Sequence, residues 1–232
     1  MEEKCEPIIE LKKVTKLYNK VPALEEVNLR IFPKEFVILV GPSGAGKSTL
    51  IKMLIREEKP DSGTISVAGR DIVKMSSGDL PYYRRNIGTV FQDYKLLPTK
   101  NVFENVAYAL EVAGISDDEI HTRVPKVLRA VGLEKKAYSY PDQLSGGEAQ
   151  RTSIARALIH NPKILIADEP TGNLDPEASR DIAAILEKIN CLGTCVILAT
   201  HDKELVDKMR KRVVGMKDGK IVSDHQHGKY TC

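Results

Sequence analysis

This sequence of 232 residues lacks the segments that would insert it into a membrane or export it. It has no run of about 18 apolar residues, and Met1-Glu2-Glu3-Lys4-Cys5 shows no signal-peptide pattern. Repeats and low-complexity linkers are also missing. We therefore expect a chain that stays in the cytoplasm and reaches a membrane only through a partner.

Cysteine is scarce and scattered. The four cysteines, Cys5, Cys191, Cys195 and Cys232, have neither the paired spacing of zinc ligands nor that of a disulfide framework, so we expect reduced thiols. The run His225-Gln226-His227 with Cys232 could bind stray metal ions, but residues 225–232 are more simply a terminal tail.

An excess of charge of one sign is missing as well. Thirty-five basic residues against thirty-two acidic ones give a formal net charge of +3, which provides no broad field for nucleic acid. We therefore expect no nucleic-acid partner. One local cluster could lie near anionic lipid headgroups, although a solvated helix face is the commoner explanation. It consists of Lys203, Lys208, Arg210, Lys211 and Arg212.

What the sequence does contain is a glycine-rich segment between an apolar run, residues 36–40, and a helical pattern, residues 48–54. Glycines let consecutive backbone N–H groups turn inward around phosphates at a helix N-terminus. Lys47 would then reach the β- and γ-phosphates of a nucleotide, and Ser48 would ligate Mg²⁺. An ordinary glycine-rich turn is the alternative. The candidate nucleotide-binding residues are Gly41, Pro42, Ser43, Gly44, Ala45, Gly46, Lys47, Ser48 and Thr49.

A second buried strand, predicted at residues 164–167, is followed by two adjacent acids. Open α/β sheets place their sites at the carboxyl ends of such strands. Asp168 would hold Mg²⁺ through a water, and Glu169 would orient and polarise the attacking water. A solvated strand end would also explain this pair.

The segment Ser145-Gly146-Gly147-Glu148 has the spacing of a capping box at the start of a helix. A well-capped helix would be explanation enough, except that two glycines weaken a helix while exposing N–H groups at its positive end. We therefore expect a second anion-binding surface here. A chain with two phosphate-binding surfaces but only one glycine-rich nucleotide-binding loop, or P-loop, favours a composite site, in which the two kinds of surface bind the same nucleotide.

Together these motifs resemble the nucleotide-binding subunits of ABC transporters, over nearly all of residues 8–224. The resemblance implies an α/β fold of the P-loop NTPase type, with a RecA-like core, an inserted α-helical subdomain and an antiparallel β part. It implies one domain, with a core lobe at about 8–91 and 156–224 and a helical lobe at about 92–155. In this family two subunits pack head to tail, and each ATP and Mg²⁺ lies between the P-loop of one and the Leu-Ser-Gly-Gly segment of the other.

Four further site residues follow from the resemblance. Tyr18 matches the ring that stacks on adenine, although a half-buried tyrosine at a strand end is the alternative. Gln92 matches the glutamine that contacts Mg²⁺ and the attacking water. His201 matches the histidine that touches the γ-phosphate, and Asp175 lies in the segment that crosses between subunits.

Residues 91–98 and 102–107 most closely resemble the FtsE branch of cell-division ATPases. That branch implies a membrane partner, FtsX, which controls peptidoglycan hydrolases, and other division proteins as further partners. The string at residues 171–175 is shared with lipoprotein-releasing and macrolide-exporting ATPases, so a true exporter is the alternative. A nucleotide-dependent binding module with negligible turnover is a third hypothesis.

The segment after Gln92 is the expected docking surface for the membrane subunit. Tyr94, Leu96 and Leu97 favour a groove that receives a short helix, whereas Phe103 favours a place in the core. Val102 could belong to either.

Two residues depart from the family pattern. Ala149 replaces a common Gln, and we expect it to face solvent or the second subunit. Lys34 replaces a common Gly and requires a turn that tolerates a side chain.

Overall fold

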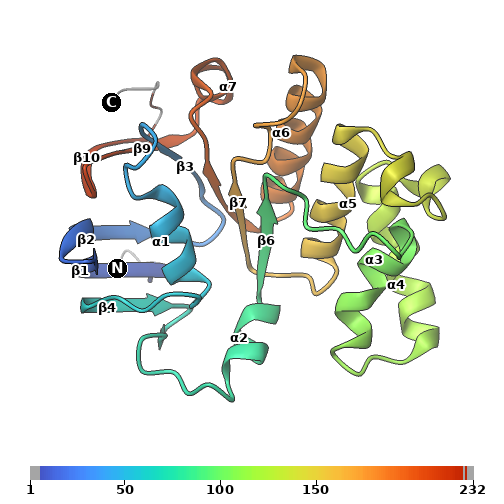
Figure 1. Cartoon of the computed structure of the whole chain (residues 1–232), viewed down its shortest axis with the longest axis horizontal. Helices are drawn as coiled ribbons and strands as arrows, with labels where there is room; N and C mark the ends of the chain where they lie inside the picture. Colours follow the sequence, from blue (N-terminus) through green and yellow to red (C-terminus); the bar gives the residue numbers. More distant parts are fainter. Residues whose placement is uncertain (1–5, 227, 229–232) are drawn as a thin grey trace, which may run out of the picture.

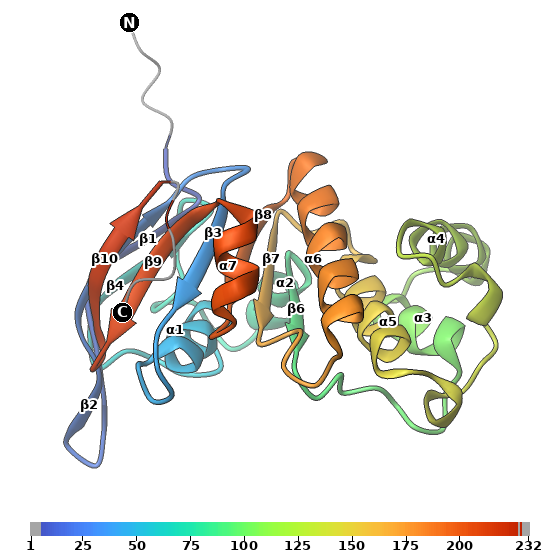
Figure 2. The same ribbon diagram turned by 90° about the horizontal axis from the view of Figure 1, so that it is seen from above.

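The computed structural model describes residues 6–226 and 228, and two sheets dominate it (Figures 1 and 2). Cys5, His227 and Cys232 lie outside the described residues. The smaller sheet is antiparallel, with the strand order β2-β1-β4-β5. Its strands are β1 (Ile9–Tyr18), β2 (Val21–Ile31), β4 (Ser62–Val67) and β5 (Arg70–Asp71). This sheet is the expected antiparallel part.

The larger sheet has the order β10-β9-β3-β8-β7-β6, and all its neighbouring pairs are parallel except β9 with β10. Its strands are β3 (Phe36–Val40), β6 (Ile87–Phe91), β7 (Ile164–Asp168), β8 (Cys195–Ala199), β9 (Arg212–Lys217) and β10 (Lys220–His225). The two buried strands predicted from apolar runs, at residues 36–40 and 164–167, are therefore confirmed as β3 and β7. His225, expected at the start of the tail, is the last residue of β10.

The register of this sheet aligns the ends of its central strands. Leu39 pairs with Ala199, Ala199 with Asp168, and Asp168 with Phe91. The segments that follow these four residues therefore leave the sheet at one edge, the edge where parallel α/β sheets place their sites.

The described part of the chain also has seven α-helices and two 3₁₀-helices, Glu134–Lys136 and Pro141–Gln143. The α-helices are α1 (Lys47–Leu54), α2 (Leu80–Arg85), α3 (Val102–Glu111), α4 (Asp117–Ala130), α5 (Gly146–Leu158), α6 (Pro176–Cys191) and α7 (Lys203–Met209). In Figure 2, α3 and α4 lie at the opposite end of the molecule from β1, β2 and β10. The helix α5 continues through residue 155, where the boundary between the two lobes was placed.

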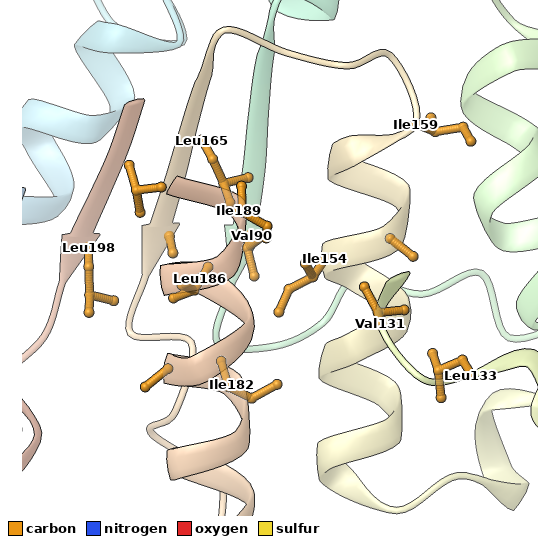
Figure 3. Close-up of a cluster of buried hydrophobic side chains, with 14 of the residues drawn as sticks. Val90, Val131, Leu133, Ile154, Ile159, Leu165, Ile182, Leu186, Ile189 and Leu198 are labelled. Carbon is orange, nitrogen blue, oxygen red and sulfur yellow. The ribbon is translucent and has the colours of Figure 1, made fainter. Parts of the chain in front are cut away.

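Each face of the large sheet has its own core. Val37 and Leu39 of β3 pack with α1 and the antiparallel sheet, whereas Ile38 and Val40 pack with α5, α6 and α7. The second cluster, shown in Figure 3, joins the strands to the helices far from the antiparallel sheet. Its members include Val90, Leu165 and Leu198 from strands, Ile182, Leu186 and Ile189 from α6, Ile154 from α5, and Val131 and Leu133. The helix α5 thus packs against α6 and directly against β6, one of the strands that end at the site edge, where Gln150 Nε2 donates to Phe91 O at 3.3 Å.

The two residues that depart from the family pattern, Ala149 and Lys34, lie in different kinds of place. Ala149 is only 6% exposed, so the expectation that it faces solvent or a second subunit is wrong; it lies on the buried face of α5 with Gln150 and Ser153. Lys34 has φ 65° at the third position of a turn closed by Glu35 N–H donating to Phe32 O at 3.2 Å. With Pro33 before it, this is the geometry of a type II turn, in which glycine is usual.

The basic cluster does not form one solvated surface. Arg212 is 8% exposed in β9 and pairs with Glu35 at 3.0 Å and with Asp224 at 2.7 Å, so for this residue both the lipid-facing patch and the preferred solvated helix face are wrong. Lys211 pairs with Glu187 at 3.1 Å. Within residues 6–226 and 228, no helix is both long and apolar enough to cross a membrane.

Candidate functional site

The glycine-rich loop joins β3 to α1, as the sequence predicts. A Cβ on Gly41 would lie 2.3 Å from the carbonyl oxygen of Met216, so no larger residue fits beside β9. Gly46 has φ 101°, and a Cβ there would lie 2.6 Å from Ala23 O. The loop is therefore pressed between β9 and the β1–β2 hairpin, and only glycine allows both close approaches.

Lys47 is the first residue of α1 and is only 8% exposed. Its Nζ donates to Gly41 O at 2.7 Å and to Pro42 O at 3.3 Å, which holds the ammonium over the loop. The helix has Gly46 as its N-cap, with no side-chain cap and no acid in its first turn. Its N-terminal N–H groups and its positive dipole end are therefore left for an anion.

Asp168 ends β7 beside this loop. One carboxylate oxygen, Oδ1, is buried and has no hydrogen-bond partner among the described residues. The carboxyl group as a whole still forms a hydrogen bond with the Ser48 hydroxyl. Burial raises the pKa of the Asp168 carboxyl, the nearby charge of Glu169 raises it further, and Ser48 and Lys47 oppose the shift. A buried carboxylate oxygen beside a hydroxyl is a donor set that suits a hard cation such as Mg²⁺. A cavity of about 400 Å³ is lined by Ser48, Gln92, Asp168 and Glu169, among others.

Glu169 follows in a left-handed conformation, with φ 48°. Its N–H donates to Ala199 O at 2.9 Å, and its Oε2 lies 2.9 Å from Nδ1 of His201. Such a backbone costs about 1–3 kcal/mol in a non-glycine residue and is common where a side chain must be aimed at a site. The sequence does not predict this left-handed backbone, because the proline that follows Glu169 favours an extended conformation instead.

One cavity of about 380 Å³ brings most of the predicted site together. It is lined by Ser43 to Thr49, Ala23, Gln92, Glu169 and His201. The side chain of Gln92 donates to Asn173 Oδ1 at 3.1 Å, so it bridges the end of β6 to the segment after β7.

Tyr18 does not line this cavity. It pairs with Val21 near the turn of the β1–β2 hairpin and is 41% exposed, with the Lys16 ammonium 5.3 Å above its ring. Ala23 of the same hairpin does line the cavity. Tyr18 is therefore an accessible ring on the hairpin that adjoins the loop.

The second signature begins α5 with the predicted capping box. Ser145 accepts from Glu148 N–H, and Glu148 Oε2 accepts from Ser145 N–H at 2.9 Å. This bond and the ion pair with Lys136 lower the pKa of Glu148. The box leaves the N–H groups of Gly146 and Gly147 unused, at the positive end of a 13-residue helix.

The two glycines also have a packing role that sequence reasoning missed. A Cβ on Gly146 would lie 3.0 Å from Leu174 and 3.1 Å from the Tyr94 hydroxyl, and one on Gly147 would lie 3.2 Å from Ala178. None of residues 145–148 lines either of the two cavities that include Ser48. The two predicted phosphate-binding surfaces are thus separate within one chain.

Asp175 is exposed and serves as the N-cap of α6. It accepts from the N–H groups of Glu177 and Ala178, both at 2.9 Å, and these bonds lower its pKa. This capping role is separate from the predicted subunit contact.

The predicted docking segment is only partly open. Tyr94, Leu96 and Leu97 are half-buried, and Phe103 packs against the core and stacks on His121, as expected. Val102 is 1% exposed and belongs to the core.

Comparison with known proteins gives consistent matches. The family model described as "ABC transporter" matches residues 24–172. The chain is 54% identical over 224 residues to the cell division ATP-binding protein FtsE of Bacillus subtilis, covering 96% of this chain and 98% of that one. It is 45% identical to the FtsE of Escherichia coli K12, covering 89% and 90%.

Solved structures agree. The dimeric ATP-binding cassette MJ0796, in a post-hydrolysis state bound to ADP and Pi, matches with a TM-score of 0.86 and 35% identity, covering 96% of this chain and all of that one. The cbiO1 protein of Clostridium perfringens matches with a TM-score of 0.88 and 32% identity, covering 95% and 89%.

Proposed function

The chain belongs to the ABC transporter family of ATP-binding domains, and we propose that it is the ATP-hydrolysing subunit of an FtsEX-like cell-division complex. The observation that carries the proposal is the 54% identity to a named FtsE along nearly the full length of both chains. In this proposal, closure of an ATP-bound dimer is transmitted to a membrane subunit of the FtsX type, which regulates peptidoglycan hydrolysis. The chain would act at the cytoplasmic face of the bacterial inner membrane.

Each site residue has a role in hydrolysis that follows from its position. Lys47 and the N-terminus of α1 bind the phosphates, because both present positive charge to the same cavity. Glu169 accepts the proton of the attacking water, and His201, at 2.9 Å from its carboxylate, holds that carboxylate in place. Gln92 lies between this cavity and Asn173, so it is placed to relay the state of the phosphates.

Asp168, Ser48 and Gln92 would hold Mg²⁺. The unpartnered Oδ1 of Asp168 supports this, because a buried carboxylate oxygen is costly without a cation or a donor. The ion, when bound, neutralises charge that develops on the transferred phosphoryl group.

The active unit would be a homodimer. Residues 145–148 lie apart from the P-loop cavity of their own chain, so the N–H groups that the capping box leaves unused are free to complete the site of a second copy, with Asp175 at the contact. The dimeric arrangement of the MJ0796 cassette supports this reading.

Purification of the tagged chain from membranes tests the proposal. We expect an FtsX-type protein with a large extracytoplasmic loop to co-purify, together with slow ATP hydrolysis that is lost on chelation of Mg²⁺. Transport of a lipoprotein or a drug by the purified complex would contradict the proposal in favour of an exporter. Absence of turnover in that complex would favour a binding module.

A further inference from the structure

Glu148 places a negative charge beside the surface that the proposed function assigns to the ATP of a second copy. It is the acid of the first turn of α5. Its Oε2 accepts from Ser145 N–H at 2.9 Å, and Ser145 directly precedes Gly146 and Gly147, whose N–H groups the capping box leaves unused. The carboxylate therefore lies close to the N–H groups that would bind anionic phosphates.

This carboxylate is ionised at neutral pH. The hydrogen bond from Ser145 N–H and the charge of Lys136 hold the pKa of Glu148 below its usual value, although burial opposes them. A negative charge at this position stabilises α5, because it lies at the positive end of the helix dipole. The same charge repels a triphosphate that approaches the same helix end. Glu148 thus favours the start of the helix and disfavours the binding of ATP beside it.

Lys136 compensates this charge. Its Nζ lies 3.2 Å from Glu148 Oε1, so one carboxylate oxygen faces Lys136 and the other accepts from Ser145 N–H. Within residues 6–226 and 228, Lys136 is the one cation that forms an ion pair with Glu148. The side chains are 41% and 18% exposed, respectively, so water still screens the pair in a single chain. A second copy that covers the pair would remove that water and strengthen the effect of both charges.

The backbone that carries Lys136 is held by hydrogen bonds on both sides. Lys136 ends a 3₁₀-helix, where its N–H donates to Leu133 O at 3.0 Å and its carbonyl accepts from Ser139 N–H at 2.9 Å. Between these residues, Ala137 O accepts from Phe103 N–H, in the first turn of α3, at 2.8 Å. The ammonium therefore extends toward α5 from a turn with a fixed backbone.

We propose that Lys136 is a positioning residue of the composite site, which neutralises and holds the Glu148 carboxylate so that residues 145–148 can bind the ATP of a second copy. The inference rests on the proposed function for the composite site, and it adds a residue outside the signature segment. The neighbouring Lys135 does not share this place, because it is exposed and forms no ion pair with the residues that the structure describes.

Neutral substitution of Lys136 in the Glu169→Gln background tests the inference. ATP with Mg²⁺ is the probe, and sedimentation velocity measures the dimer association constant. The matched control, Lys135→Gln, makes the same charge change one residue away. A homodimer contains the ion pair twice, so a loss of about threefold at each site becomes about tenfold for the dimer. We expect that loss for Lys136→Gln, dimerisation close to the background for the control, and recovery with Lys136→Arg.

Glu148→Gln distinguishes neutralisation from a merely structural ion pair. Its amide oxygen can still accept from Ser145 N–H, so the capping box remains while the negative charge is removed. We expect Glu148→Gln to dimerise at least as tightly as the background, and Lys136→Gln to have little further effect in the Glu148→Gln background. The tenfold difference between Lys136→Gln and Lys135→Gln should also shrink as salt rises from about 0.05 to about 0.5 M. Loss of a structural contact would instead make Glu148→Gln as weak as Lys136→Gln, which would overturn the inference.

ATP binding to the single chain, measured at concentrations too low for dimerisation, should be the same in all these variants. That result shows that the chain is folded and that the P-loop is intact. Normal dimerisation of Lys136→Gln, or an equal loss for Lys135→Gln, would overturn the inference alone. A Glu169→Gln chain that does not dimerise with ATP would overturn the composite site of the proposed function, and the inference with it.

Discussion

Replacement of Glu169 by glutamine should separate ATP binding from hydrolysis. Glutamine has the same shape and keeps the backbone bond to Ala199 O, and its amide oxygen can still accept from His201, which lies 2.9 Å from Glu169 Oε2. It cannot take a proton from water. A positioned general base contributes about 10²–10⁴-fold, which corresponds to about 2.7–5.4 kcal/mol of activation free energy at about 1.36 kcal/mol for each tenfold.

Single-turnover phosphate release at saturating ATP and Mg²⁺ measures this loss directly. Equilibrium binding should give an ATP affinity close to that of the wild-type chain. Size-exclusion chromatography with light scattering should then show an ATP-bound dimer that accumulates, because it can no longer be hydrolysed. A variant that hydrolyses ATP within about threefold of the wild-type rate would refute the role of Glu169 as the base.

A double-mutant cycle with His201 sharpens the result. If His201 acts by holding the Glu169 carboxylate, then His201→Ala should add little to the loss once Glu169 has been replaced. Losses that simply add on the free-energy scale would show that the histidine acts on the phosphate independently. The cycle therefore distinguishes a positioning histidine from a second catalytic group.

Three further predictions concern binding and stability. Lys47→Ala should weaken ATP binding about 10- to 100-fold in an equilibrium assay, since a hydrogen bond to a charged group is worth about 1.5–3 kcal/mol, and wild-type affinity would contradict the P-loop assignment. Lys34→Gly should stabilise the fold by about 0.5–1 kcal/mol, or about 1–4 °C in Tm, because the left-handed strain relieved exceeds the added chain entropy; a lower Tm would argue against strain at this turn. Arg212→Ala should destabilise the fold by about 2–3 kcal/mol in urea unfolding, because it leaves two carboxylates without their partner, whereas Lys211→Ala should change it by less than about 1 kcal/mol. Equal effects of the two changes would contradict the buried network.

The parts of the fold that the sequence predicts are those with a local physical cause. The strands β3 and β7 lie in the middle of a parallel sheet and are covered on both faces, so they appear in the sequence as unbroken apolar runs. The start of α5 was predicted for a similar reason, because a capping box places both of its partners within four residues.

The errors arose where the cause lies far away in the chain. Arg212 is buried because it meets Glu35, which is 177 residues distant, and no local pattern marks that pair. Ala149 is small and apolar enough for either a surface or an interior, so its burial depends on how α5 packs, and its own sequence context does not determine it.

Two energetically unfavourable features, a strained backbone and an unpartnered buried oxygen, lie next to each other at the site. Glu169 has a left-handed backbone before a proline, and the adjacent Asp168 buries a carboxylate oxygen without a partner among the described residues. Each of these costs free energy, and the neighbouring backbone holds Glu169 in place: Glu169 N–H donates to Ala199 O, and its carbonyl accepts from Gly172 N–H at 3.1 Å. These two bonds hold the strained backbone in place, and from it the carboxylate reaches His201 and the cavity of the glycine-rich loop. The strain is thus a consequence of aiming the side chain, and a variant that relaxed this backbone would lose the aim together with the cost.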